Sequence, residues 1–492
     1  MDSKFFVGLD IGTTSIKITV IDEQKIVQYE KQYHYHYDVL PNDWLEISPE
    51  IWKDIVIKAF DELFESFPCQ ISSIGITGQM HTTVFIDSEG NSIRPAILWN
   101  DMRTKNIIPK IKQLLQENAS YPYIENILSN GSPLANILWL KENESENYRI
   151  LNKIMMPLNY INYILSGEKS MDYCDASTTS LYDISKREWA YPIFEMFSLS
   201  KNLFPEVTSA THIIGNLKTH FLERWNQKDP VAIITGTGDN IASVIATTNF
   251  KSDQPIISLG TSGVLIIPDA FPNIKPVGKN VIAKIVDEDD TIITQGTVQS
   301  GAKVNSWWIE KILGLSDYSQ FQEKIDWSLL GKNEVMFVPH LNGEKTLFSN
   351  PNLRGAFIGL GLETTKYEMY LSILEGIAFG MKMIFNDLCE ENYFSNLIIV
   401  GGGAKSKLWV TIFANVFNLP IKHISSPCDA VYGAAILALM SQKNKYDDDW
   451  NQEYELIVPN QTTAQSYEKK YLKYSQLLEI ITQNPKVFSV EI

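Results

Sequence analysis

Two stretches of the chain share one pattern of hydrophobic and polar positions. Residues 5–21 form an apolar run, a Gly-Thr-Thr segment at 12–14, and a second run in which apolar and polar residues alternate. Alternation with a period of two is typical of a half-buried strand, so this stretch predicts a β-hairpin. Residues 255–267, PIISLGTSGVLII, repeat the design around Gly-Thr-Ser at 260–262. The repeat favours a duplicated domain; two unrelated hairpins are the alternative that so short an echo leaves open.

Strand-like and helix-like patterns alternate along the rest of the chain. Residues 71–76 and 83–86 predict strands, whereas residues 52–64 and 368–385 carry apolar side chains at helical spacing. Strands that alternate with helices predict an α/β fold.

The chain is long enough for two or three cores. Its 492 residues exceed the ~100–200 of one typical domain. The polar segment 247–253, TTNFKSD, precedes the second hairpin and is the best candidate for a boundary. We therefore expect domains at residues 1–248 and 249–492, with a ligand cleft between them.

Composition and charge narrow the class of partner. Hydrophobic residues make up 44% and charged residues 20%, as in ordinary soluble proteins. The net charge of −16 argues against a nucleic-acid partner, although a local nest of backbone N–H groups can still bind the phosphates of a magnesium-bound nucleotide. The four cysteines are widely separated, and no apolar run approaches the ~20 residues of a membrane span. We expect a cytoplasmic protein without a disulfide framework or a membrane partner.

The Gly-Thr-Thr segment is a candidate phosphate-binding loop. Gly12 can adopt backbone conformations closed to other residues, so the amides of Thr13 and Thr14 can point together at a phosphate. Asp10 ends the preceding strand and can hold Mg²⁺, which commonly binds one or two carboxylates plus phosphate oxygens. An ordinary hairpin turn is the alternative, and the second copy at 260–262 favours the phosphate loop.

A second glycine-rich segment, IVGGGAKSKLW at 399–409, follows a predicted strand. Its glycines allow a flat ring or a phosphate to approach the backbone. The dinucleotide pattern GxGxxG is not matched, and the Walker pattern GxxxxGK[ST] is absent from the chain. Phosphate binding would therefore use another architecture, and a plain strand-to-helix turn is the alternative.

Polar side chains gather at two further strand ends. TGQMHT at 77–82 presents Gln79, Met80 and His81, and ILWNDMRT at 97–104 carries Trp99 and Asp101. Polar groups beside an aromatic ring suit a polyhydroxylated ligand, whose hydroxyls need donors and acceptors and whose C–H face packs on apolar surface. A purely structural histidine is the alternative for His81.

The segment ITGTGDNIAS at 234–243 is the candidate for proton transfer. It runs from a predicted strand into glycines and then to Asp239 and Asn240. A carboxylate at the mouth of such a turn can take a proton from a substrate hydroxyl. An aspartate that caps the following helix is the alternative, and spacing by itself favours the cap.

Together these motifs resemble the FGGY carbohydrate kinases, a family built on a duplicated actin-like ATPase fold of the ribonuclease H type. The match runs from Gly8 to about Met440 and includes GAFIGLGLETTKYEMYLSILE at 355–375. Within the family, WLEISPEIW, GQMH, ILWND and GDN are most similar to the members that phosphorylate a ketopentose. The resemblance therefore implies transfer of the ATP γ-phosphate to a sugar hydroxyl, converting D-xylulose to D-xylulose 5-phosphate.

The resemblance also implies roles for individual residues. Asp239 matches the family's general base. The expected sugar-binding residues are Gln79, Met80, His81, Trp99, Asp101, Asp239 and Asn240. The expected ATP-binding residues are Gly12, Thr13, Thr14, Lys17, Gly260, Thr261, Gly301, Asn305, Gly402, Gly403 and Ala404, and Asp10 and Asp239 are the expected Mg²⁺ ligands. The expected partners are the sugar and ATP, with a homodimer as a further option.

Three residues depart from the family pattern. Thr82 stands where a glycine usually follows GQMH, Thr237 where a glycine precedes GDN, and Asn136 where a lysine is expected. The methyl and hydroxyl of Thr82 can narrow the sugar pocket or add a contact. A kinase of the same family for another polyol, gluconate or a deoxyketose is an alternative function, and a non-catalytic, nucleotide-switched actin-like binding protein is an alternative of another class.

Overall fold

The computed structural model divides the chain into two compact units. The described residues are 4–117, 122–248, 254–260, 262–270, 273–275, 278–288, 291–341, 343–344, 350, 353–389, 394–424, 429–443 and 453–484. The first unit comprises residues 1–251, 269–293 and 427–451, and the second comprises 252–268, 294–426 and 452–492. The chain thus first changes unit after Lys251, close to the predicted boundary after Thr248, and two later segments return to the first unit.

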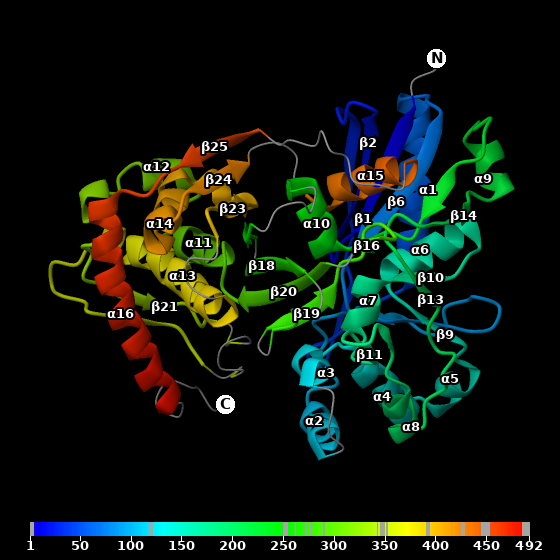
Figure 1. Cartoon of the computed structure of the whole chain (residues 1–492), viewed down its shortest axis with the longest axis horizontal. Coiled ribbons are helices and arrows are strands. Elements are labelled where there is room, and N and C mark those ends of the chain that lie inside the picture. The colour runs from blue at the N-terminus through cyan, green and yellow to red at the C-terminus, as the bar shows by residue number, and fades with distance from the viewer. Residues whose placement is uncertain are drawn as a thin grey trace. The chain divides into compact units, whose positions relative to one another are not determined.

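A mixed sheet forms the centre of the first unit (Figure 1). Its strand order is β14-β15-β6-β1-β2-β3, with β16 beside β6. β1 is antiparallel to β2 and parallel to β6, so the predicted hairpin is confirmed. The strands are β1 (Phe5–Ile11), β2 (Ser15–Asp22), β3 (Val27–His34), β6 (Ile71–Gly78), β14 (Ile213–Asn216), β15 (Ala232–Ile234) and β16 (Thr237–Gly238). Shorter strands of this unit are β4 (Asp38–Leu40), β5 (Trp44–Ile47), β7 (Val84–Ile86), β8 (Ala96–Ile97), β9 (Lys153–Met155), β10 (Ser170–Asp172), β11 (Tyr182–Asp183), β12 (Glu188–Trp189), β13 (Glu206–Thr208) and β19 (Lys279–Ile282).

Helices pack against this sheet through apolar faces and, in one case, through glycines. α1 buries Trp52, Phe60 and Leu63, which recur at helical spacing. α15 approaches β1 closely because β1 has a glycine there: a Cβ at Gly8 would lie 2.1 Å from the carbonyl oxygen of Val431. The helices of this unit are α1 (Pro49–Ser66), α2 (Ile108–Glu117), α3 (Pro122–Ile127), α4 (Pro133–Asn143), α5 (Ser145–Ile150), α6 (Pro157–Ser166), α7 (Tyr173–Thr178), α8 (Tyr191–Met196), α9 (Thr219–Arg224), α10 (Asp239–Thr248) and α15 (Ala430–Ser441).

The second unit repeats the strand topology of the first. Its strands follow the order β20-β18-β17-β23-β24-β25. β17 is antiparallel to β18 and parallel to β23, as β1 is to β2 and β6. β24 is parallel to β23 and antiparallel to β25, as β15 is to β6 and β14. The duplication predicted from the two hairpins is therefore confirmed.

The elements of the second unit surround the long helix α13, predicted over 368–385 and observed over Lys366–Leu388. Its strands are β17 (Ile256–Leu259), β18 (Gly263–Ala270), β20 (Thr291–Val298), β21 (Met336–Val338), β22 (Ala356–Ile358), β23 (Leu397–Val400), β24 (Ile421–Ile424) and β25 (Tyr454–Ile457). Its helices are α11 (Lys303–Ser306), the π-helical η1 (Trp307–Ile312), α12 (Tyr318–Gln322), the short η2 (Trp327–Leu329), α13, η3 (Gly402–Lys405), α14 (Lys407–Phe417) and α16 (Gln461–Gln483).

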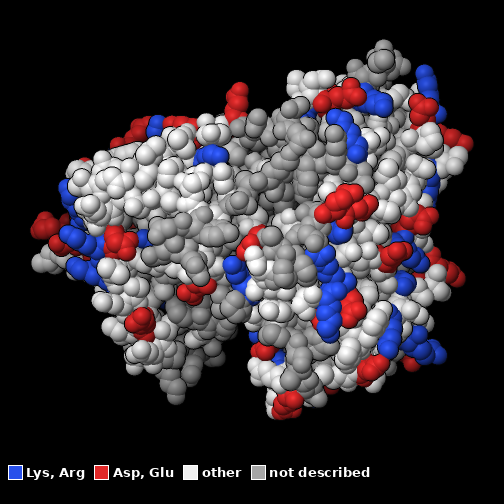
Figure 2. Space-filling view, in the orientation of Figure 1, with Lys and Arg blue, Asp and Glu red and all other residues white. Residues whose placement is uncertain are grey.

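Charged side chains of both signs are interspersed on the molecular face drawn in Figure 2. Among the described residues of that face, no broad basic patch stands out, in keeping with the net charge of −16. Within the described part of the chain, no helix combines the length and apolarity that a membrane crossing needs.

Candidate active site

Three neighbouring strands of the first unit end at the same edge of the sheet. In the parallel register, Ile11 of β1 lies opposite Gly78 of β6, and Gly78 lies opposite Gly238 of β16. The segments that follow these strands carry three of the predicted motifs, which are therefore neighbours although they are far apart in sequence. The carboxyl ends of parallel strands are the usual ligand-binding edge of an open α/β sheet.

The Gly-Thr-Thr loop is built as a tight turn with unused donors. Its first amide, from Gly12, donates to the carbonyl of Ser15 at 3.0 Å. Among the described residues, the amides of Thr13 and Thr14 have no hydrogen-bond partner, as a phosphate-binding nest requires. The hydroxyl of Tyr35 donates to the Gly12 carbonyl and stabilises the loop.

The reason for glycine at position 12 differs from the one predicted. Gly12 does not adopt a positive φ. A Cβ there would instead lie 3.0 Å from the carbonyl oxygen of Ser15, so crowding within the turn disfavours a side chain.

Two carboxylates stand at this edge of the sheet. Burial raises the pKa of Asp10 to about 7, and the negative charge of Asp239 adds to the rise, whereas Lys17 lowers the pKa. Burial raises the pKa of Asp239 to about 6, against the opposing hydrogen bond from the amide of Asn240. Paired acids with raised pKa values are typical of catalytic sites.

The pair fits a divalent cation. Oδ1 of Asp10 is buried and has no hydrogen-bond partner among the described residues. Two carboxylates that interact through their charges, beside the Gly-Thr-Thr loop, match the chemistry of Mg²⁺, which takes one or two protein carboxylates together with phosphate oxygens. No group of three or more metal-ligating side chains occurs in the described part of the chain, so phosphate and water would complete the coordination.

Lys17 lies opposite Asp10 in the β1–β2 register. Its ammonium group pairs with Oδ2 of Asp429 at 2.8 Å. Asp429 also caps α15 by accepting the amide of Tyr432. The predicted ATP-binding residue Lys17 is thus held by a helix cap of the same unit, and it acts on Asp10 through its charge.

Asp239 lies at the start of α10. It is the first residue of the helix, and its Oδ1 accepts the amide of the next residue, Asn240, at 2.8 Å. An N-cap residue, in contrast, directly precedes the first helical residue. The carboxylate is positioned at the positive end of the α10 dipole, beside the ends of β6 and β1.

Three predicted sugar-binding residues follow strand ends: Met80 and His81 come after β6, and Trp99 comes after β8. Met80 packs against β16, where a Cβ at Gly238 would lie 2.7 Å from its Cγ. His81 has φ +66°, a left-handed conformation that few residues other than glycine adopt. Trp99 is 40% exposed, which is unusual for a residue of its size.

The structure assigns the predicted sugar-binding residue Asp101 a different role. Its carboxylate is fully buried, and its two oxygens accept Nε and Nη2 of Arg103, both at 2.9 Å. Arg103 is in turn stacked between the rings of Trp44 and Trp139, at 4.7 Å from each, and pairs with Glu46. The backbone amides of Leu45 and Arg103 donate to the same two oxygens, so Asp101 has no acceptor position left for a sugar, and it anchors the loop that carries Trp99.

Gln79 is likewise committed inside the protein. It is only 2% exposed, and both ends of its amide are bonded to the phosphate loop and to Thr82. The prediction that it contacts the sugar is therefore not supported by its position.

Sequence reasoning missed two acids behind Asp239. Asp172 caps α7 and accepts the hydroxyl of Thr237 at 2.5 Å, and burial raises its pKa to about 6. Both carboxylate oxygens of Asp175 are buried without a hydrogen-bond partner among the described residues. Burial, followed by the charges of Asp172 and Asp239, raises the pKa of Asp175 well above its usual range. The sequence signal that could have revealed these two acids is the D-x-x-D spacing in MDYCDAS. Thr237 bonds to Asp172, so its side chain contacts these acids rather than the predicted sugar surface.

In the second unit, the glycines predicted to bind ATP meet at the equivalent sheet edge. β17 and β23 are parallel neighbours, so Gly260 and the Gly401–Gly403 segment follow adjacent strand ends. A Cβ at Gly301 would lie 2.2 Å from the backbone of Ser262, and one at Gly403 would lie 2.8 Å from the ring of Trp409. Ala404 is buried, whereas Gly402 is open to solvent with no atom within 4 Å of a Cβ position. Thr261 lies outside the described residues.

A hydrogen-bond chain joins two of these predicted nucleotide segments. The hydroxyl of Ser406, which caps α14, donates to Gln322 at 2.8 Å, and Gln322 donates to the hydroxyl of Tyr370 at 2.7 Å. Tyr370 donates to Oδ1 of Asn305 at 2.6 Å. Because Oδ1 accepts this bond, the amide of Asn305 is fixed in orientation. Gln322 and Tyr370 carry no motif and were not predicted.

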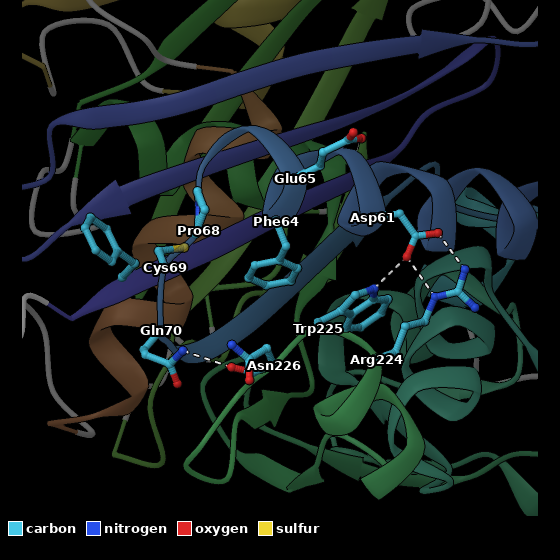
Figure 3. A pocket seen from close by; sticks show the side chains of 10 residues that line it. Asp61, Phe64, Glu65, Pro68, Cys69, Gln70, Arg224, Trp225 and Asn226 are labelled. Atoms are coloured by element: carbon cyan, nitrogen blue, oxygen red, sulfur yellow. Dashed lines mark hydrogen bonds and ion pairs between the residues drawn. The ribbon is translucent and has the colours of Figure 1, made fainter.

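A separate pocket of about 610 Å³ lies at the opposite, amino ends of β1 and β6 (Figure 3). Asp61 accepts hydrogen bonds from Arg224 and from the indole of Trp225 in its wall. Gln70 donates to the backbone of Asn226. Because these polar side chains are bonded to the protein itself and lie far from the paired acids in the sheet, the catalytic site is not assigned to this pocket.

Both halves of the chain match models of one family. Residues 5–246 match the N-terminal domain, and residues 256–442 the C-terminal domain, of the FGGY family of carbohydrate kinases. The chain therefore belongs to the FGGY family of carbohydrate kinases, as its motifs indicated.

Individual relatives narrow the comparison. The chain is 26% identical over 483 residues to a xylulose kinase of Staphylococcus xylosus, covering 96% of this chain and 100% of the relative. A solved structure described as a xyloylose kinase from Brucella ovis has a TM-score of 0.90 at 26% identity and covers 97% of this chain and 99% of its own. A gluconate kinase structure from Lactobacillus acidophilus also reaches a TM-score of 0.90, at 22% identity, with 99% and 100% coverage. The last comparison shows a shared fold alone.

Proposed function

We propose that this carbohydrate kinase transfers the γ-phosphate of ATP to a hydroxyl of D-xylulose, forming D-xylulose 5-phosphate. The observation that carries the proposal is the convergence of Asp239, the Met80–His81 segment and the Thr13–Thr14 loop at adjoining strand ends. The choice of xylulose is supported by the relative from Staphylococcus xylosus, which is similar over nearly the whole chain.

In this proposal the sugar lies against Trp99, Met80 and His81, with its reacting hydroxyl next to Asp239. The ionised carboxylate of Asp239 accepts the hydroxyl proton as the oxygen attacks the γ-phosphorus. Asn240 follows the base directly along the chain and would orient a second hydroxyl.

The loops bind the nucleotide. The amides of Thr13 and Thr14, which have no partner among the described residues, donate to phosphate oxygens, and in the second unit Asn305, Gly402, Gly403 and Ala404 form the nucleotide surface. Asp10, together with Asp239, would hold Mg²⁺, which supplies positive charge that offsets the charge of the phosphates. Positioning and charge stabilisation are what phosphoryl transfer chiefly requires.

A substrate screen tests the choice of sugar. ADP release coupled to a spectrophotometric signal is measured with D-xylulose, D-ribulose, a deoxyketose, glycerol and D-gluconate. The proposal expects the highest kcat/KM with D-xylulose. A higher value with gluconate or a polyol would retain the kinase and refute the sugar, whereas ADP release that does not depend on any sugar would favour a nucleotide-switched binding protein.

The base is tested by Asp239→Asn. Because general-base catalysis contributes ~10²–10⁴-fold, turnover should fall by about that factor while MgATP binding persists. Asn caps helices about as well as Asp, so a merely structural Asp239 would tolerate the change. Asp229→Asn, an exposed position in the loop before β15, is the matched control and should keep normal turnover. Near-normal turnover of Asp239→Asn would show that the base is another group.

A further inference from the structure

Four residues, Thr13, Gln79, Thr82 and Trp99, form a closed ring of hydrogen bonds at the Gly-Thr-Thr loop. Thr13 and Thr82 both donate their hydroxyl protons to Oε1 of Gln79, at 3.3 and 3.0 Å. The same hydroxyl oxygens accept the two N–H groups of Trp99: Thr13 takes the indole Nε1–H at 3.1 Å, and Thr82 takes the backbone N–H at 3.1 Å. A hydroxyl has one proton to donate, so neither threonine has a hydroxyl proton left for a ligand.

Only one assignment of donors and acceptors fits the hydrogen bonds of the ring. Nε2 of Gln79 donates to the carbonyl of Gly12 at 3.3 Å, so Oε1 is the end of the amide that faces the two hydroxyls. The backbone amide of Gln79 also donates to Ile11 at 3.0 Å. Gln79 is therefore held in one orientation, and its hydrogen bonds connect the end of β1 to the loop that carries Trp99.

Thr82 cannot act on a sugar directly. Its side chain is fully buried, so the expectation that it narrows the sugar pocket or adds a contact is wrong. Trp99, in contrast, is 40% exposed and offers its ring to a ligand. Any effect of Thr82 on the sugar must pass through the residue whose backbone it holds.

We propose that Thr82 is a positioning residue for the sugar site: its hydroxyl fixes the backbone of Trp99 and so sets the ring of Trp99 as one wall of that site. The inference rests on the proposed function, because it takes Trp99 as a sugar-contacting residue. Trp99 is held at two points before any ligand arrives, at its backbone by Thr82 and at its indole by Thr13. Such preorganisation reduces the entropy that sugar binding would otherwise lose.

The kinetic test compares Thr82→Val, which keeps the shape and removes the hydroxyl, with Thr82→Ser, which keeps the hydroxyl. Loss of one neutral hydrogen bond corresponds to roughly a three- to tenfold change in an equilibrium constant. We expect the sugar KM of Thr82→Val to rise by about that factor, with the KM for MgATP within about twofold, and Thr82→Ser to restore the sugar KM. Thr211→Val removes another buried hydroxyl, one that donates to Ile285, and should leave both KM values unchanged.

A double-mutant cycle separates positioning from a general loss of structure. In a Trp99→Ala background, Thr82→Val should raise the sugar KM no further, because the ring that it positions is absent. An equal rise in both backgrounds, an unchanged sugar KM in Thr82→Val, or failure of Thr82→Ser to restore it would overturn the proposal.

A structural readout keeps the test independent of the sugar. With ¹⁵N-labelled tryptophan, the indole N–H signal of Trp99 is assigned by its loss in Trp99→Phe. Its hydrogen exchange should be faster in Thr82→Val than in the wild type and Thr82→Ser, and unchanged exchange would refute the ring. If the wild type phosphorylates no sugar in the screen, the proposed function fails, whereas this measurement still decides whether Thr82 fixes Trp99.

Discussion

Replacing Asp10 with asparagine should stabilise the protein while it abolishes the proposed metal site. Asp10→Asn keeps the size of the side chain and removes its charge. The pKa of Asp10 is about 7 in the folded chain against an ordinary value of 3.8, because burial and then the charge of Asp239 disfavour ionisation. When no cation is bound, the ionised form of Asp10 that prevails at higher pH therefore lowers the free energy of unfolding.

The magnitude follows from the size of the pKa shift. One pKa unit corresponds to about 1.4 kcal/mol, so ionising Asp10 costs the folded state up to about 4 kcal/mol at about pH 8. Between about pH 4 and pH 7, Asp10 keeps its proton in the folded state but has lost it in the unfolded chain. The free energy of unfolding therefore falls as the pH rises through that window. The advantage of Asp10→Asn should accordingly shrink by about 3 kcal/mol between about pH 8 and pH 4.5.

Urea unfolding in the presence of EDTA measures this difference. Asp54→Asn, which changes an exposed carboxylate on α1, is the control and should follow the wild-type pH profile. Mg²⁺ in place of EDTA should raise the stability of the wild type and leave Asp10→Asn unchanged, since a ligand stabilises only the state that binds it. If Asp10→Asn is no more stable than the wild type at high pH, or if its advantage does not depend on pH, the account of the paired acids is wrong.

Three further results are expected. Because Asp239 has a pKa of about 6 and acts when ionised, kcat/KM should rise with pH to a plateau above that value and fall about tenfold per pH unit well below it; a flat profile from kinetics at pH 5 to 8 would contradict the base. Gly301→Ala should lower the melting temperature and weaken ATP binding in a calorimetric titration, since its Cβ would lie 2.2 Å from backbone, whereas Gly402→Ala, with no atom within 4 Å, should leave the melting temperature unchanged. Tyr370→Phe should raise the KM for ATP roughly three- to tenfold and spare the sugar KM, because it frees the amide of Asn305; equal effects on both substrates would argue against that role.

Local sequence patterns were sufficient to place the strands and the turns of the site. The period of two in residues 5–21 and 255–267 predicted both hairpins, and the matching Gly-Thr-Thr and Gly-Thr-Ser turns predicted the duplication that the strand order confirms. These features depend on neighbours along the chain. A strand followed by a glycine-containing turn needs no distant contact to be recognised.

The tertiary structure alone decided which polar side chains remain available to a ligand. Asp101 and Gln79 lie in motifs that favoured sugar binding, yet their oxygens are used by Arg103 and by the hydroxyls of Thr13 and Thr82. A side chain has few hydrogen-bonding positions, and partners that arrive from other strands occupy them first. Lys17 meets Asp429 only because α15 returns to the first unit from far along the chain. The sequence identified the segments that carry the polar side chains, and packing between distant segments determined which of those side chains can still bind a ligand.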